Sequence, residues 1–554
     1  MSEGFDYIVV GGGSAGCVMA ARLSEDTAST VLLLEAGGND DHPYIKMPLG
    51  FLRAMTRPEF NWTYWTEEEP HLNGRRLPLP RGKVMGGSGS INGMFAMRGH
   101  PADYDQWAQM GARGWSYADC LPYFRKLEDS WRGESLYHGK GGPVRIRPID
   151  SPHLLHEEMM ASAGNAGFAT VDDLNGPNYE GFARGEQSVD DKGHRVSSAS
   201  AYIKPALGRR NLDVRQRQLV TRVVFEGKRA IGVEIDGPAG PTLVRARKEV
   251  ILAGGAYNSP HLLLLSGIGP AEHLKEHGIA VLHDSPGVGR NLQEHPTASL
   301  EFEAKEKVTF LRQLRWDRLA LNAARWALTG TGPLASQLNS CNVVVRTDPR
   351  LDRPDMQIMV NPIRFDAQTW FPGIKPEQDH VFWAGIVQLH PESRGWVQLK
   401  SADPREVASV TLNIMSEEAD LVQMRRAIRT ARKIYRSEPM ASLVGAERPP
   451  TAGAESDDEL DALIRATCYV GMHPVGTCAM AQGARSVVDE ECRVIGVEGL
   501  RVVDASVMPT VPGGNTAIPV TMVAEKVADA MRGQSLPPAE LPPPPASQRE
   551  AVAA

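Results

Sequence analysis

The chain has 554 residues, of which 42% are hydrophobic and 23% are charged, as in an ordinary globular protein. Its formal net charge of −7 provides no basic surface for nucleic acid. The sequence contains no apolar run as long as a membrane span, so we do not expect a transmembrane protein.

The first residues and the cysteines predict a cytoplasmic location. Residues 1–6 include no basic side chain, and the first apolar run is too short for a signal peptide. The 6 cysteines are scattered, without a Cys-x-x-Cys pair, which is typical of reduced thiols. The length suffices for roughly three to four average domains, or for two large ones built from interleaved segments.

The first predicted unit is a strand, a tight turn and a helix. Residues 5–10 form a β-branched run, glycines follow, and residues 17–23 carry small and apolar side chains at helical spacing. A second strand over 30–34 ends in Glu35, about twenty residues past Gly16. Dinucleotide folds place there the acidic residue that binds a ribose diol.

The glycine spacing in this turn fits a dinucleotide phosphate. Gly11 permits the turn, Gly13 lets the backbone approach a pyrophosphate, and Gly16 lets the helix lie close to the strand. Free N–H groups at the helix N-terminus attract the phosphates. A glycine turn in an ordinary βαβ unit is the alternative, but strand, helix and carboxylate all agree with a nucleotide site. The predicted cofactor-binding residues here are Gly11, Gly13, Ser14, Ala15, Gly16, Glu35 and Ala36.

The same turn has a second interpretation. Residues 12–16 match Gly-x-Ser-x-Gly, the nucleophile elbow of α/β-hydrolases. A hydrolase elbow requires earlier strands and an upstream oxyanion loop, and only about ten residues precede Ser14. Hydrolysis is therefore the weaker hypothesis.

Two further glycine-rich segments follow along the chain. Taken alone, residues 82–92 have the composition of a flexible surface loop. Taken with the nucleotide site, their unhindered backbone is suited to passing close to a second, flat part of a cofactor, which FAD needs and NAD does not. The other segment, 254–269, follows a buried strand over 250–253. In it we expect Ser259 to cap a helix that has Pro260 at its first position.

These two segments, in this order, resemble the signatures of the glucose-methanol-choline (GMC) family of FAD-dependent oxidoreductases, especially its choline-dehydrogenase-like branch. The similarity runs from about residue 5 to residue 531. The resemblance implies an α/β fold in which an FAD-binding Rossmann-like domain is interleaved with an α+β substrate domain built on an antiparallel sheet. It also implies cofactor contacts from Gly86, Gly87, Asn92, Val220, Asp504, Ala505, Asn515 and Thr516.

The domain boundaries follow from the same resemblance. The FAD-binding domain is expected to comprise residues 1–95, 190–295 and 464–534, and the substrate-binding domain residues 96–189 and 296–463. The proline-rich tail, 535–554, is expected to be disordered. We predict no metal site, because His273 and His277 share a helix face without a third ligand.

The candidate catalytic residues lie near the C-terminal end. His473 resembles the active-site histidine of the family, and Asn515 resembles its partner. A neutral imidazole near its natural pKa removes the hydroxyl proton of an alcohol, and an amide donates to the alkoxide as charge develops. A lone histidine is more often structural, and Asn515 can also cap a helix. The resemblance favours the catalytic interpretation.

One position departs from relatives with covalent FAD. Some choline-oxidising members attach FAD to a histidine immediately before the Asn92 position, but Ile91 stands there in this chain, so noncovalent FAD is predicted.

The predicted activity is the FAD-dependent oxidation of a primary alcohol, of aromatic or furanic type, to the aldehyde. The expected electron acceptor is oxygen, a quinone or a carrier. Choline is the alternative substrate. An FAD-containing hydroxynitrile lyase is the competing class, and light-driven decarboxylation is more remote, because those relatives lack the histidine.

Overall fold

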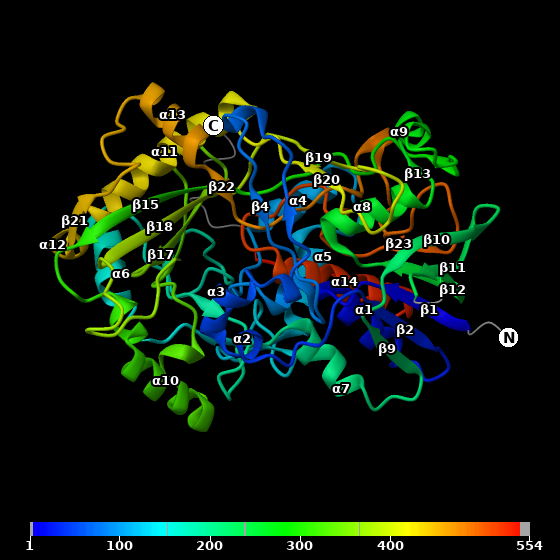
Figure 1. The fold of residues 1–554 in the computed structure, drawn as a ribbon, viewed down its shortest axis with the longest axis horizontal. Helices are drawn as coiled ribbons and strands as arrows, with labels where there is room; N and C mark the ends of the chain where they lie inside the picture. Colours follow the sequence, from blue (N-terminus) through cyan, green and yellow to red (C-terminus); the bar gives the residue numbers. More distant parts are fainter. Residues whose placement is uncertain (1–3, 152, 238–239, 365, 543–554) are drawn as a thin grey trace.

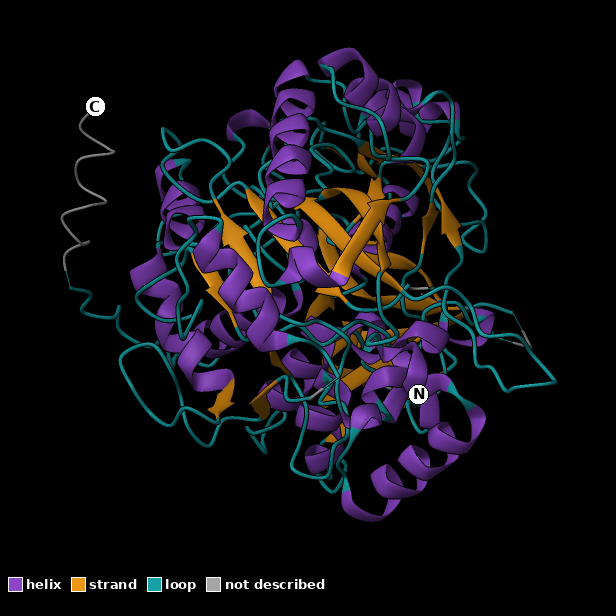
Figure 2. Cartoon of the chain, turned by 90° about the vertical axis from the view of Figure 1, so that its left-hand side faces the viewer, coloured by secondary structure: helices purple, strands orange, loops and turns teal. Residues whose placement is uncertain are grey.

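Two large sheets organise the protein. The structure, a computed structural model, describes residues 4–151, 153–237, 240–364 and 366–542. Each of the two sheets has seven strands, and the sheets lie in different halves of the molecule (Figure 1). Helices surround the strands, which occupy the centre in the view of Figure 2. The predicted fold, a Rossmann-like unit interleaved with an α+β unit on an antiparallel sheet, is confirmed.

The first sheet carries the predicted βαβ unit. Its strand order is β10-β11-β12-β1-β2-β9, with β23 beside β12. Five of these strands run parallel to one another, namely β9, β2, β1, β12 and β23. Strands β10 and β11 add an antiparallel edge next to β12. The strands are β1 (Gly4–Val10), β2 (Val31–Glu35), β9 (Leu212–Gln216), β10 (Val220–Glu226), β11 (Arg229–Ile235), β12 (Thr242–Leu252) and β23 (Leu500–Val502).

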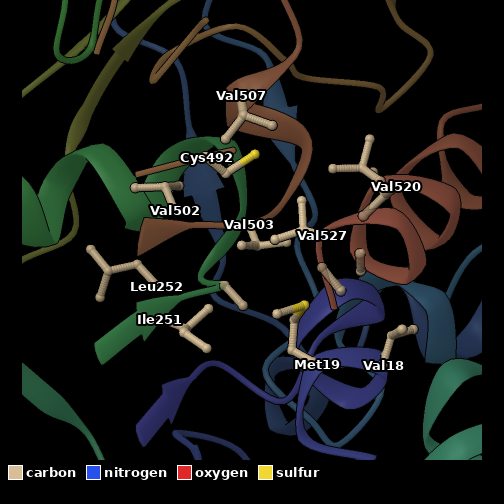
Figure 3. Close-up of a cluster of buried hydrophobic side chains, with 14 of the residues drawn as sticks. Val18, Met19, Ile251, Leu252, Cys492, Val502, Val503, Val507, Val520 and Val527 are labelled. Carbon is tan, nitrogen blue, oxygen red and sulfur yellow. The ribbon is translucent and has the colours of Figure 1, made fainter. Parts of the chain in front are cut away.

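Helices from both ends of the chain cover this sheet. Helix α1 (Ser14–Leu23) packs against α14 (Ala517–Met531), which in turn packs against α5 (Tyr117–Leu127). Figure 3 shows Met19 of α1 and Val527 of α14 close to Ile251 and Leu252 of β12. Both ends of the sequence therefore contribute to one apolar core.

The second sheet is antiparallel. Its order is β21-β15-β18-β17-β16-β7, with β22 beside β15. Helix α11 (Glu418–Tyr435) packs on it, and Tyr435 stacks on Phe302 at 4.9 Å between ring centroids. The strands are β7 (Gly181–Ala183), β15 (Pro296–Ala304), β16 (Asn342–Val345), β17 (Met356–Asn361), β18 (Val381–Gln388), β21 (Val444–Glu447) and β22 (Tyr469–Val470).

Shorter elements connect these layers. The remaining helices are α2 (Pro43–Lys46), α3 (Phe51–Ala54), α4 (Pro101–Gln109), α6 (His156–Asn165), α7 (Lys204–Ala206), α8 (Gly255–Leu265), α9 (Ala271–Glu276), α10 (Trp316–Thr329), α12 (Met440–Leu443) and α13 (Asp457–Thr467). The remaining strands are β3 (Tyr64–Trp65), β4 (Pro78–Leu79), β5 (Glu128–Ser130), β6 (Val144–Pro148), β8 (Glu186–Gln187), β13 (Ile268–Gly269), β14 (His283–Asp284), β19 (Trp396–Gln398) and β20 (Ser409–Thr411). Among the described helices, none is long and apolar enough to cross a membrane.

The predicted start of α8 was wrong. The helix begins at Gly255, whose φ of +83° suits glycine, so Pro260 lies inside the helix and Ser259 does not cap it. Proline cannot donate to the carbonyl four residues earlier, that of Ala256. The hydroxyl of Thr477 donates to that carbonyl instead, at 2.7 Å. This distant contact is why the helix tolerates an internal proline.

The beginning of the C-terminal tail also differs from expectation. The proline-rich composition predicts disorder. The Leu536 N–H, however, donates to the Tyr123 hydroxyl at 2.8 Å, and the Ala539 N–H donates to the Ala118 carbonyl at 2.8 Å. The tail is therefore held against α5 as far as these residues, and residues 543–554 lie outside the described part of the chain.

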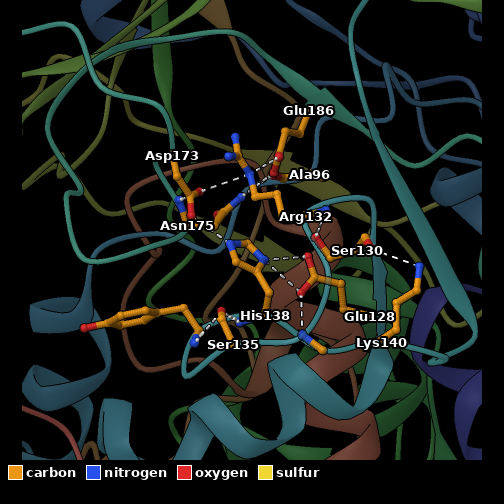
Figure 4. Close-up of polar contacts among 12 residues, drawn as sticks. Ala96, Glu128, Ser130, Arg132, Ser135, His138, Lys140, Asp173, Asn175 and Glu186 are labelled. Atoms are coloured by element: carbon orange, nitrogen blue, oxygen red, sulfur yellow. Dashed lines mark hydrogen bonds and ion pairs between the residues drawn. The ribbon is translucent and has the colours of Figure 1, made fainter.

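A buried polar network joins the segments between β5 and β8 (Figure 4). His138 lies between two carboxylates, with Nε2 at 2.7 Å from Asp173 and Nδ1 at 3.1 Å from Glu128. Arg98 also pairs with Glu128, at 2.6 Å. The two acids outweigh the burial of the imidazole and raise the pKa of His138 to about 9. His138 is therefore a protonated, structural residue at neutral pH.

We expect this network to make stability depend on pH. Because the folded pKa of His138 exceeds its ordinary value of 6.5, its contribution to the free energy of unfolding is complete below pH 6.5 and is lost as the pH rises to about 9. The contribution is up to about 3 kcal/mol. Urea unfolding should therefore show His138→Gln less stable than the parent at pH 6, with the gap narrowing towards pH 9. A gap that stayed constant would contradict the prediction.

Candidate active site

One cavity of about 660 Å³ is lined by residues from both sheets. Most of the predicted site residues lie in its wall, although their positions span the chain. These are Gly11, Gly13, Ser14, Ala15, Glu35, Ala36, Gly87, Asn92, Val220, His473, Asp504, Ala505, Asn515 and Thr516. Gly16 and Gly86 are outside the wall.

The glycines shape one end of this cavity in different ways. A Cβ at Gly16 would lie 1.8 Å from the Gly11 carbonyl oxygen, so this glycine is needed for helix packing. A Cβ at Gly13 would meet only the Ala253 carbonyl oxygen, at 3.8 Å. The protein itself therefore has room for a side chain at Gly13, and its absence leaves space for a ligand. The N–H of Gly86, a residue with φ of +86°, donates to the Gly12 carbonyl at 2.7 Å and so joins the 82–92 segment to the 11–16 turn.

Glu35 braces this turn from the end of β2. Its carboxylate accepts hydrogen bonds from the N–H groups of Gly12, at 2.8 Å, and Gly37, at 2.7 Å. Burial raises the pKa of Glu35 to about 7, although the two N–H groups oppose the shift. Because the side chain also lines the cavity, it remains available to a ribose hydroxyl.

Asp504 performs a similar task beyond β23. Its carboxylate accepts from the Gly255 N–H at 2.8 Å and from the Ser259 hydroxyl at 2.5 Å, at the start of α8. Its other oxygen accepts from the N–H and hydroxyl of Ser506. The carboxylate thus holds the glycine-rich segment 254–269 against residues 504–506.

His473 and Asn515 meet in the cavity wall. The Asn515 amide Nδ2 lies 3.0 Å from His473 Nε2, and the Gln357 amide donates to Asn515 Oδ1 at 3.3 Å. On the other side of the ring, His473 Nδ1 lies 2.9 Å from His295 Nδ1. Asn515 does not cap α14, where Thr516 is the residue before the first turn. The chain therefore brings together the two predicted residues and a histidine that was not predicted.

These contacts are compatible with one tautomer of His473 in which Nε2 carries the lone pair. If the Nδ1 proton of His473 is donated to His295, Nε2 is free to accept from the Asn515 amide. Burial, reinforced by His295 and Arg81, holds the pKa of His473 well below its ordinary value. The pKa is thus lower than the nearly natural value expected from the sequence, and this keeps the imidazole neutral throughout the physiological range.

Glu294 supports both histidines from behind. Its carboxylate accepts the backbone N–H of His473 at 2.5 Å and the backbone N–H of His295 at 2.9 Å. Burial raises the pKa of Glu294 to about 7. Sequence reasoning missed Glu294 and His295. The His-Pro pair offers no signal, because it recurs at 42–43, 100–101, 295–296, 390–391 and 473–474.

Arg195 was also missed. Its buried guanidinium donates to the Asn92 carbonyl and side-chain oxygens, both at 2.7 Å, and burial lowers its pKa to about 9. The arginine thus fixes the end of the 82–92 segment.

His273 is not part of the cavity wall. Its Nε2 accepts the Leu399 N–H at 3.0 Å, which is a structural role.

Comparison with known proteins decides the family. Models described as GMC oxidoreductase match residues 5–297 and 391–524. The chain belongs to the GMC oxidoreductase family. It is thus an oxidoreductase that acts on CH–OH donors, and the weaker hypothesis of an α/β-hydrolase is not retained.

Relatives of this GMC oxidoreductase include oxygen-dependent choline dehydrogenases. Those of Brucella canis and of Pseudomonas savastanoi pv. phaseolicola are each 42% identical, over 96% of this chain and 96% and 94% of their own lengths. Among solved structures, pyridoxine 4-oxidase from Mesorbium loti is 30% identical with a TM-score of 0.84, and formate oxidase is 27% identical with a TM-score of 0.89. Both alignments cover 96% of this chain and 99% of the other.

The cavity fits the cofactor of this family. The space left at Gly13, the N-terminus of α1 and the carboxylate of Glu35 form a cradle that suits a pyrophosphate and a ribose. FAD, as predicted, is the cofactor that membership of the GMC family supports.

Proposed function

We propose that this GMC oxidoreductase oxidises a neutral primary alcohol, of aromatic or furanic type, to the aldehyde. The observation that carries the proposal is that His473 Nε2 and the Asn515 amide, 3.0 Å apart, share one cavity with the glycine cradle. When bound there, FAD supplies the acceptor for the hydride that leaves the alcohol carbon.

The residues divide the proton chemistry between them. His473 takes the hydroxyl proton at Nε2, and Asn515 donates a hydrogen bond to the alcohol oxygen as negative charge develops on it. The Nδ1 proton, donated to His295, holds the ring in this orientation. Glu294 accepts the backbone N–H groups of His473 and His295 and so holds the two imidazoles in position.

The cavity wall favours a neutral substrate. Apolar and aromatic side chains contribute to it, namely Phe51, Leu52, Met55, Phe95, Leu338, Met359 and Trp383. The acidic residues in the described wall are Glu35, Asp504 and Glu406; the first two brace the glycine segments, and Glu406 acts on His261 of α8. None of these three carboxylates has a hydrogen bond or ion pair with His473 or Asn515, and Glu294, behind His473, is not part of the described wall. A quaternary ammonium in the wall beside His473 would therefore lack a direct carboxylate partner.

Choline is the second candidate substrate. The names of the 42% identical relatives favour it. Aromatic rings in the wall, such as Tyr469, also suit a cation, because ring faces attract quaternary ammonium groups.

Anaerobic mixing of the holoenzyme with single substrates tests the proposal. We expect benzyl or furfuryl alcohol to bleach the oxidised flavin band faster than choline does. Faster bleaching by choline would favour the second candidate, and turnover of a cyanohydrin without bleaching would favour a lyase. When the reduced enzyme is returned to air, peroxide formation identifies an oxidase, and persistent bleaching identifies a quinone or carrier as the acceptor.

We also predict that FAD is bound noncovalently. Ile91, buried in the cavity wall beside Asn92, offers no nucleophile for the flavin. Acid precipitation of the purified protein should therefore leave the yellow colour in the supernatant. Colour that stayed in the pellet would contradict this prediction.

Two further assignments belong to the proposal. We assign FAD binding to residues 1–95, 190–295 and 464–534 and substrate binding to residues 96–189 and 296–463. Every strand of the first sheet falls in the FAD-binding part, and every strand of the second sheet except β22 falls in the substrate-binding part.

The second assignment is the location. The buried, unpaired thiols of all six cysteines support a cytoplasmic location.

A further inference from the structure

The three most exposed large apolar side chains of the described residues lie on α10 or in a turn that contacts the start of α10. They are Leu328, Leu321 and Ile374, which are 84%, 72% and 68% exposed; the next is Leu207, at 59%. Leu321 and Leu328 lie on α10, and Ile374 lies in the 370–375 turn, which is tied to the start of α10 by stacking of Trp316 on Phe371. We call Trp316, Leu321, Leu328 and Ile374 the α10 patch.

The α10 helix is apolar on two faces. Its inner face contributes Leu319 and Trp326, which pack on a cluster that includes Phe310 and Leu334. Leu321 and Leu328 are one heptad apart and lie on the opposite face. Figure 1 shows α10 at the periphery of the molecule. Two highly exposed leucines on the outer face of a helix that is already packed on its inner face mark this face for contact with a partner.

Cations lie on α10 and next to it. Arg318 and Arg325 each stand three positions before a leucine of the α10 patch, and Lys375 follows Ile374. Like Arg312 in the preceding turn, these side chains form no ion pair with any of the described residues. Asp317, the acid on the helix, is paired with Arg315 at 2.6 Å. In a chain with a net charge of −7, this is a local excess of unpaired positive charge beside exposed leucines.

We propose that the α10 patch docks on a lipid bilayer with anionic headgroups. An amphipathic helix of this kind lies in the interface, with apolar side chains among the acyl chains and arginines at the headgroups. A second copy of the chain is a poorer occupant, because a two-fold contact would place the same unpaired arginines against one another. Anionic headgroups instead pair with them.

A buried cluster connects the inner side of α10 with the cavity wall. The cluster beneath α10 includes Leu338 and is packed by Leu52, and both residues also line the cavity. The α10 helix and this cluster therefore lie between the α10 patch and the cavity wall. The docking itself does not rest on the proposed function.

Flotation of the purified holoenzyme with vesicles tests the proposal. We expect the enzyme to float with vesicles of phosphatidylcholine and phosphatidylglycerol and to float less with phosphatidylcholine alone. The double variant Leu321→Glu/Leu328→Glu should lower the partition coefficient at least about tenfold per leucine, because burial of one leucine is worth more than a tenfold change. Arg318→Gln should weaken binding to the anionic vesicles alone. Leu207→Glu, an equally drastic change at an exposed leucine of another element, should bind as the parent does.

Three results would overturn the proposal. The first is failure of the parent to float with anionic vesicles, and the second is a loss of flotation in Leu207→Glu as large as that in the double variant. A parent dimer in light scattering that the double variant converts to a monomer, without vesicle binding, would identify a second copy as the occupant. Because the leucines are on the surface, the double variant should keep the parental rate of flavin reduction by a water-soluble alcohol, which shows that a loss of flotation is not a loss of folding.

Discussion

Replacement of His473 by alanine is expected to slow reduction of the bound flavin by an alcohol by about 10²–10⁴-fold. Nε2 of its imidazole, to which we assign the lone pair that takes the proton, lies 3.0 Å from the Asn515 amide in the cavity wall. Its low pKa keeps it unprotonated, so the loss should persist across the neutral pH range and should not be restored by raising the pH. Anaerobic stopped-flow absorbance measures the rate directly.

The variant is informative because it separates chemistry from cofactor binding. The ring of His473 contacts His295 and Asn515, and its backbone N–H bond to Glu294 survives the change to alanine. The flavin content and the apparent FAD dissociation constant should therefore remain near the parental values. His277→Ala, a change of a partly exposed histidine on the C-terminal side of α9, is the matched control. Undiminished reduction in His473→Ala would remove His473 as the base.

Local patterns explain why the nucleotide half could be predicted. The β-branched run before Gly11 and the leucines before Glu35 became β1 and β2, because their apolar side chains are buried on both faces of a parallel sheet. The glycine spacing also placed the turn correctly, since Gly11 and Gly16 approach each other too closely for a Cβ. Such features are determined by residues near one another in the sequence.

Contacts between distant segments explain what could not be predicted. The tautomer of His473 depends on His295, and the N–H groups of both depend on Glu294, more than 170 positions earlier than His473. The internal Pro260 of α8 is tolerated because Thr477 donates to the orphaned carbonyl of Ala256. No periodicity or spacing in a single sequence encodes these pairings, and they arise only when the two sheets are assembled.

Gly13→Ala and Gly16→Ala are expected to behave differently, although both change the same glycine motif. At Gly13 the added methyl group meets only the Ala253 carbonyl oxygen, at 3.8 Å, so the apoprotein should fold normally. The methyl group would, however, project into the space proposed for the pyrophosphate. A misfit of this size costs about 1–3 kcal/mol, so the FAD dissociation constant should rise about 10–100-fold.

At Gly16 the added methyl group would lie 1.8 Å from the Gly11 carbonyl oxygen, which forces α1 away from β1 and should destabilise the apoprotein itself. Thermal unfolding without FAD, followed by fluorescence titration with FAD, distinguishes the two outcomes. Gly164→Ala, within α6 and with open space around the new methyl group, controls for the change of residue type. If Gly13→Ala bound FAD as tightly as the parent, the phosphates would have to pass elsewhere, because nothing in the protein alone requires a glycine at that position.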